Sequence, residues 1–299
     1  MITINPFSEL SEFIPSITMQ AFVVVMIILV VAGTVVDMIH KKNVKYFFEN
    51  AKKAKKQATR TVSAGKKASI VLKTVASDVL TTSELAGKRR LAHLLGMYGT
   101  VIFWVTSAIM IFNYSTPESV TPSILPLLWH LGAIMTCLGG YWFWFFLRVD
   151  VAAEGNPWYR LVKADLFVLS LVVTATFGLV WSYLQTASIS GWDTLFLVLF
   201  ILSNLVLFGG VYWSKFAHMF YKPGAAIQKH LAEAAQNIIV PYIPRRWASL
   251  RLPANSEVVR TSDATVFNTI DVFFPTLTVL VACFFAFFAF SKKYLTFFL

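Results

Sequence analysis

Two histidines lie where this chain could hold an iron porphyrin. His93 lies near the start of an apolar stretch over 91–113, and His218 follows another apolar stretch over 193–213. If the stretches between them cross a membrane in alternate directions, both imidazoles lie at similar depth on one side. Imidazole nitrogen binds haem iron, and helical bundles hold cofactors between facing helices. The pair predicts one b-type haem with His93 and His218 as axial metal ligands. Two interfacial histidines bonded to loops or lipid headgroups would give the same pattern.

Glycines accompany both candidate ligands. Gly96 and Gly99 follow the first histidine within two turns, and Gly209 and Gly210 precede the second. Residues three positions apart lie on one face of a helix, so glycines there leave room beside a ligand. We therefore expect these glycines to make space for a flat macrocycle between the helices.

Cations gather at the same level of the chain as the two histidines. Arg90, Arg148 and Lys215 are the candidates for contact with the haem propionates, because buried carboxylates need cationic partners. The alternative for each of them is a plain anchor at the membrane surface.

The other three histidines favour simpler roles. His40 adjoins a lysine at the end of the first apolar stretch, and His230 lies in a polar segment, so both are expected at the surface. His130 lies at the opposite end of its stretch from His93 and has no histidine facing it. A hydrogen bond within the bundle is its expected role, and ligation of a second cofactor is the alternative.

The composition identifies a membrane protein. Hydrophobic residues make up 57% of the chain and charged residues 14%, whereas soluble domains carry about 25% charged residues. A bilayer-spanning helix needs about 20 apolar residues. Six stretches approach this length: 19–39, 91–113, 123–147, 163–185, 193–213 and 272–291. The fold predicted is an all-α integral membrane protein with about six transmembrane helices and a haem-binding helical bundle.

The placement of charge predicts the orientation of the spans. All of the 26 Lys and Arg residues except Lys292 and Lys293 fall on one side if six spans alternate. The positive-inside rule makes that side cytoplasmic. We therefore expect a multi-pass protein of the plasma membrane with its N-terminus outside and its basic loops in the cytoplasm. A net charge of +11 placed in this way argues against nucleic acid as a partner.

Three regions follow from this layout. Residues 1–90 hold the first span and a basic cytoplasmic segment, 91–220 a four-helix haem-binding core, and 221–299 a cytoplasmic segment with the last span. The stretch 41–80 mixes lysines with apolar residues, which is typical of a basic amphipathic helix on an anionic membrane surface. Docking of an acidic soluble partner is the alternative for this stretch.

Three strings of this sequence resemble one family. RLAHLLGMYGTVIFW and SKFAHMFYKP are similar to the haem-bearing spans of the membrane cytochrome b family that includes the respiratory nitrate reductase gamma subunit and the membrane cytochrome of heterodisulfide reductase. RVDVAAEGNPWYRLVKADLF looks closest to the adenylylsulfate reductase membrane anchor. The resemblance covers about 85–220.

The resemblance implies one haem where the gamma subunit has two. His93 and His218 match two positions that jointly bind one haem in that family, whereas the other two ligand positions fall at or near Phe103 and Phe200, which cannot bind iron. Phe103 is ten residues beyond His93, about 15 Å along a helix. Both ligands of the same haem are absent together, so the resemblance implies that one haem is kept and one lost.

Electron transfer is the function that this resemblance implies. The chain would pass electrons between the quinone pool and a cytoplasmic iron–sulfur or flavin redox partner through one b haem. A quinone site is not placed, and Tyr98, Lys163 and Asp165 are weak candidates. The alternative is a haem-free structural subunit that docks a redox enzyme complex.

A small-solute transporter or channel is the third class considered. It would need a polar cavity near the middle of the membrane. The residues available there are Thr106, Ser107, Ser203 and Asn204, which also occur routinely where membrane helices pack.

Overall fold

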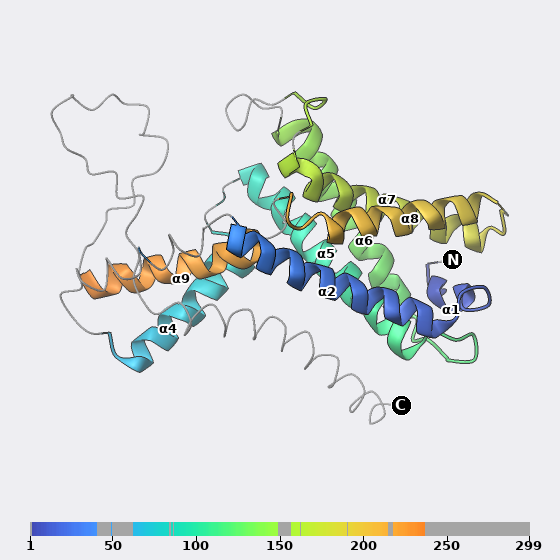
Figure 1. Ribbon diagram of the computed structural model, residues 1–299, viewed down its shortest axis with the longest axis horizontal. Coiled ribbons are helices and arrows are strands. Elements are labelled where there is room, and N and C mark those ends of the chain that lie inside the picture. Colours follow the sequence, from blue (N-terminus) through green and yellow to red (C-terminus); the bar gives the residue numbers. More distant parts are fainter. Residues whose placement is uncertain are drawn as a thin grey trace. The chain divides into compact units, whose positions relative to one another are not determined.

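The computed structural model describes residues 2–40, 49, 62–83, 85, 87–148, 157–161, 163–189, 191–214 and 218–236, without the side chains of 38, 164, 218–222 and 236. These residues are helical or lie in turns and connections. The helices form two compact units. The first holds α1, α2 and α5–α8, and the second holds α4, the short π-helix η1 and nearly all of α9 (Figure 1).

Five helices are long and apolar enough to cross a membrane, so the chain is a multi-pass membrane protein. They are α2 (Ser16–His40), α5 (Gly87–Asn113), α6 (Ile124–Trp142) with the π-helical turn η2 (Phe143–Leu147), α7 (Leu166–Thr186) and α8 (Trp192–Gly209). This confirms five of the predicted spans. The sixth, 272–291, lies outside the described residues.

The fifth span ends earlier than its apolar composition predicts. The helix α8 ends at Gly209, and Gly210 to Ser214 form a turn. His218 begins the next helix, α9 (His218–Gln236), instead of extending α8. The apolar stretch continues through the turn, so hydropathy alone places the end of this span too late.

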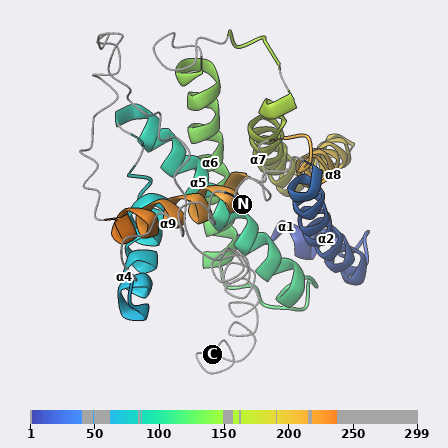
Figure 2. The same cartoon turned by 60° about the vertical axis from the view of Figure 1, so that its left-hand side comes forward.

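Glycines hold α5 and α6 close together. A Cβ atom added at Gly139 would lie 2.5 Å from the backbone nitrogen of Gly96, and one added at Gly99 would lie 2.6 Å from that of Thr136. These contacts pair the start of α5 with the end of α6, so the two helices are antiparallel. They lie side by side in both views, as do α7 and α8 (Figure 2). Small residues at such crossings are the usual means of packing helices in lipid.

The ends of several helices meet at one end of the first unit. The side chains of His40 and Tyr212 contact edge to face with centroids 5.7 Å apart. A Cβ added at Gly210 would lie 3.1 Å from Leu166 Cδ2, at the start of α7. We call this the basic end, defined by His93, Arg148 and Gly210. The opposite end, which holds Phe7, is called the aromatic end.

The second unit pairs α9 with α4 (Ala64–Thr74) and η1 (Val75–Leu80). His230 Nε2 lies 2.9 Å from an Asp78 carboxylate oxygen, and His230 Nδ1 lies 3.2 Å from Glu233. The apolar stripe of α9 includes Ile227 and Leu231, which are both buried. The His230 side chain is 38% exposed, as expected of a surface residue, and it also connects two helical segments.

We expect Gly139→Ala to separate α5 from α6. The new methyl group would meet the backbone of Gly96, and overpacking of this kind costs about 1–3 kcal/mol. Gly96→Ala is the matched control, because no described atom lies within 4 Å of a Cβ at that position. The midpoint of thermal unfolding in detergent, followed by circular dichroism, should fall only for Gly139→Ala. Equal midpoints for the two variants would contradict this packing.

Candidate functional site

His93 lies on an open face of α5. Its side chain is exposed, and a Cβ added at Gly96, one turn further on, would meet no described atom within 4 Å. Residues three apart share a helical face, so the histidine and the open position adjoin each other. Arg90 is half-buried on the preceding turn of the same face. This face therefore combines an imidazole, a cation and free space.

Gly99 does not contribute to that space. It lies in the contact between α5 and α6, where the hydroxyls of Thr100 and Thr136 also meet at 3.4 Å. The expectation that both glycines after His93 make room for a macrocycle is therefore wrong for Gly99, whose role is helix packing. Gly209 at the end of α8 is open, with no described atom within 4 Å of an added Cβ.

The structure describes only the backbone of His218 and does not describe Lys215. The backbone of His218 begins α9, and its side chain lies outside the described residues, as does the whole of Lys215. The predicted pairing of His218 with His93 is therefore not tested by the geometry. Of the weak quinone candidates, Tyr98 and Lys163 are exposed.

Arg148 is the most deeply buried cation of the described chain, with 1% of its surface exposed. Its guanidinium donates to the carbonyls of Pro157 and Arg160 at 3.1 and 2.6 Å and to the Asp165 carboxylate at 2.5 Å. It also lies 4.3 Å above the centre of the Trp144 ring. The side chain thus fastens the loop between α6 and α7, a role different from both the propionate contact and the surface anchor considered for it.

The π-helical turn η2 brings Arg148 into this position. The Arg148 amide donates to the carbonyl of Phe143, five residues earlier, at 2.9 Å. The wider turn contains Trp144, whose ring receives the guanidinium. The sequence does carry a signal for the ion pair, because a lone arginine ends one span and a lone aspartate begins the next. The expectation of a propionate partner for Arg148 overlooked this signal.

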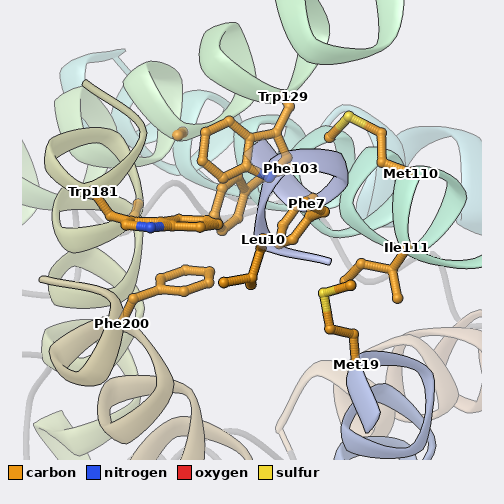
Figure 3. Packing of buried hydrophobic residues seen from close by; sticks show 11 residues of the cluster. Phe7, Leu10, Met19, Phe103, Met110, Ile111, Trp129, Trp181 and Phe200 are labelled. Atoms are coloured by element: carbon orange, nitrogen blue, oxygen red, sulfur yellow. The ribbon is translucent and has the colours of Figure 1, made fainter. Parts of the chain in front are cut away.

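The aromatic end of the first unit is filled by rings. Phe103 and Phe200 meet edge to face with centroids 6.4 Å apart, and Phe200 stacks on Trp181 at 5.7 Å (Figure 3). Trp129 lies 5.1 Å from Phe103. Gly178 admits the two phenylalanines, since a Cβ there would lie 3.1 Å from the Phe200 ring. The two positions at which the resemblance implies missing ligands therefore face each other, and their rings occupy the space between.

The short helix α1 (Pro6–Leu10) completes this aromatic cluster. The Phe7 ring lies 5.9 Å from that of Trp129 and 5.6 Å from that of Trp181, and Figure 3 shows it within the same cluster. Asn5 caps the helix and donates to the Tyr114 carbonyl at 2.7 Å. The segment closes the aromatic end of the unit, which composition and periodicity did not predict.

His130 is bonded within the bundle, as expected. Nδ1 lies 2.7 Å from the carbonyl oxygen of Pro126, and Nε2 lies 2.9 Å from the hydroxyl of Ser182. A carbonyl only accepts, so a neutral ring carries its proton on Nδ1 and accepts from Ser182. Both nitrogens are then occupied, which leaves none for a metal.

The four polar residues considered near the middle of the membrane are also hydrogen-bonded within the protein. Thr106 and Ser107 donate to carbonyls of their own helix at 2.7 Å, and so do Ser203 and Asn204 at 2.8 Å. Ser107 additionally accepts from the Trp129 indole at 2.8 Å. Bonds of this kind are routine where membrane helices pack, which was the simpler interpretation of these residues.

The chain matches no protein-family model, no curated protein and no solved structure.

We expect Arg148→Met to destabilise the protein strongly. The change leaves the Asp165 carboxylate and two carbonyls without their donor, and removing one partner of a buried ion pair costs about 3–5 kcal/mol. Arg160→Gln is the matched control, because the Arg160 side chain is exposed. Chemical denaturation in mixed micelles measures both. A similar small effect of the two variants would contradict the role of Arg148.

Phe7→Ala is expected to loosen the aromatic end. Removing the buried ring opens a void beside Trp129 and Trp181, at a cost of about 3–5 kcal/mol for a buried phenylalanine. Phe13 is 84% exposed, so Phe13→Ala is the control. Thermal unfolding and tryptophan emission should change for Phe7→Ala alone. Unchanged emission in Phe7→Ala would show that α1 does not close the cluster.

Proposed function

We propose that this chain is a membrane-anchor cytochrome b subunit with a single b haem. It would exchange electrons between quinone and a cytoplasmic iron–sulfur or flavin subunit of an adenylylsulfate reductase type of complex. The proposal includes the orientation expected from charge, with the basic loops in the cytoplasm and the N-terminus outside.

The observation that carries the proposal is the contact between Phe103 and Phe200. Their rings meet at 6.4 Å, so the second and fifth spans approach each other at the level where the resemblance implies a lost haem. Trp129 and Trp181 surround them and are at most 2% exposed. A family member that has lost one haem must fill the vacated space with side chains, and these rings would fill it.

The basic end supports the retained haem. His93 is exposed beside the open position at Gly96, whereas the aromatic end is filled. His93 and His218 would hold the haem through neutral imidazole nitrogens. When bound, the haem supplies a one-electron redox centre. Arg90 and Lys215 remain the candidates for its propionates, since the Arg148 guanidinium already binds three partners in its loop.

The alternative proposal is a haem-free structural subunit that docks a redox complex. It follows from the same resemblance, because a chain that replaced one cofactor by side chains could replace a second in the same way. The two proposals differ in whether the space beside His93 holds a cofactor.

A reduced-minus-oxidised visible spectrum of the purified chain tests the proposal. We expect about one b haem per chain, lost in His93→Ala and in His218→Ala because each supplies an axial ligand. His230→Gln is the matched control, since this histidine is bonded to Asp78 and Glu233 in the second unit.

A second variant tests the space beside the ligand. Gly96→Phe should fill the open position and lower the haem content while the fold is retained, because a Cβ added there meets no described atom within 4 Å. A folded protein purified with its natural partners and without haem would overturn the cytochrome proposal in favour of the structural one.

A further inference from the structure

Three polar side chains meet on the exposed face between α6 and α7. The Tyr141 hydroxyl lies 2.8 Å from the hydroxyl oxygen of Thr176, and the Cys137 thiol lies 3.5 Å from the same oxygen. Thr176 itself donates to the carbonyl of Val172 at 2.8 Å, so its oxygen accepts from Tyr141. Tyr141 is 40% exposed, and its bond to Thr176 is accessible from outside the helix pair.

The sequence position of Tyr141 places this hydroxyl within the hydrocarbon. Tyr141 precedes Arg148, which directly follows the span, by seven residues, or about 10 Å along a helix. Leu138 and Phe145, one turn away on either side, are apolar and 58% and 47% exposed. A charged lipid headgroup is too costly to bring to this depth. A ligand of the Tyr141 hydroxyl must therefore be uncharged and soluble in lipid.

A flat aromatic surface adjoins the hydroxyl. The rings of Tyr141 and Phe145 stack with centroids 6.1 Å apart and planes 18° apart. Aromatic rings favour offset stacking on one another, so this pair offers a surface to a further planar ring. The two helices touch beside Tyr141, because a Cβ added at Gly140 would clash with Val172 on α7. This contact holds the tyrosine against Thr176.

Tyr141 lies at a depth similar to that of the candidate haem ligand His93. A Cβ added at Gly139 would lie 2.6 Å from the Ala92 carbonyl oxygen, which aligns these two residues of the antiparallel helices α5 and α6. Tyr141 and His93 then differ in depth by about 5 Å. Two residues turn a helix by about 200°, so Tyr141 faces away from α5. A ring bound there is separated from the α5 side by the width of α6, about 10–12 Å.

We propose that Tyr141, Phe145 and Thr176 form a binding site for the head group of a quinone. The inference rests on the proposed function, which names quinone without placing it. A quinone is an uncharged planar ring that is soluble in lipid, as the depth of the site requires. Its oxidised form accepts a hydrogen bond from the Tyr141 hydroxyl, and its reduced form donates one to the same oxygen. The ring stacks on Phe145, and the tail stays in the hydrocarbon along Leu138.

Fluorescence quenching of a hydroxyquinoline N-oxide, an analogue of quinone, tests the proposal on the full chain in nanodiscs. We expect saturable binding by the wild type. Tyr141→Phe keeps the stacked ring and removes the hydroxyl, so the affinity should fall about tenfold, as for one lost hydrogen bond. Tyr183→Phe is the matched control, because Tyr183 is a 51% exposed tyrosine near the other end of α7. Its affinity should equal that of the wild type.

The possible outcomes separate this site from the proposed function. Saturable binding with equal affinity in the wild type and Tyr141→Phe would overturn the site and leave quinone exchange standing. Equal losses in Tyr141→Phe and Tyr183→Phe would also overturn the site. Absence of saturable binding by the wild type would overturn both the site and quinone exchange. The visible spectrum of each sample counts haem independently, so binding that depends on Tyr141 in a haem-free protein would support the site and contradict the haem.

Discussion

The absence of water from the hydrocarbon core is the constraint on which this structure depends. Every backbone polar group in a span must find its partner within the protein. The backbone meets this requirement by forming helices, and several side chains bond locally, although the buried hydroxyls of Thr34 and Thr174 have no hydrogen-bond partner in the described part of the chain. Thr106, Ser170 and Thr176 each donate to the carbonyl four residues earlier. Where two helices touch, glycines let the backbones approach, as at Gly139 on α6. The helices can then associate without a hydrophobic force between them.

Features that depend on one continuous segment were predictable from the sequence. The length of an apolar stretch identifies a span, so α5 and α6 begin and end within a few residues of expectation. Features that depend on distant partners were not. The Arg148 guanidinium binds carbonyls up to twelve residues away, and Asn5 binds the carbonyl of Tyr114. Neither partner has a periodic pattern to reveal it. The end of α8 was missed because hydropathy does not change where the helix stops.

The candidate site was predictable to a similar degree. The sequence singles out His93 because it is a histidine near one end of an apolar stretch, and the structure adds that its helical face is open. The resemblance singles out Phe103 and Phe200, and the structure adds that their rings meet. Sequence alone could not separate glycines that face a cofactor from glycines that face a helix. Gly96 and Gly99 differ by one turn and the backbones of both lie near α6, yet only at Gly99 would an added Cβ clash with α6, whereas one added at Gly96 meets no described atom within 4 Å.

The position of α1 has a consequence for the order in which the protein is assembled. Phe7 packs against Trp129 and Trp181, and Gln185 donates to the carbonyl of Pro6 at 3.2 Å. Residues 5–10 are synthesised before α5–α8, yet their binding site exists only after those helices have entered the bilayer and packed. Docking of this segment is therefore a late step of biogenesis, with contacts of high sequence separation. Until it docks, the rings at the aromatic end are uncovered, and during that interval the partly assembled bundle is most exposed to misassociation.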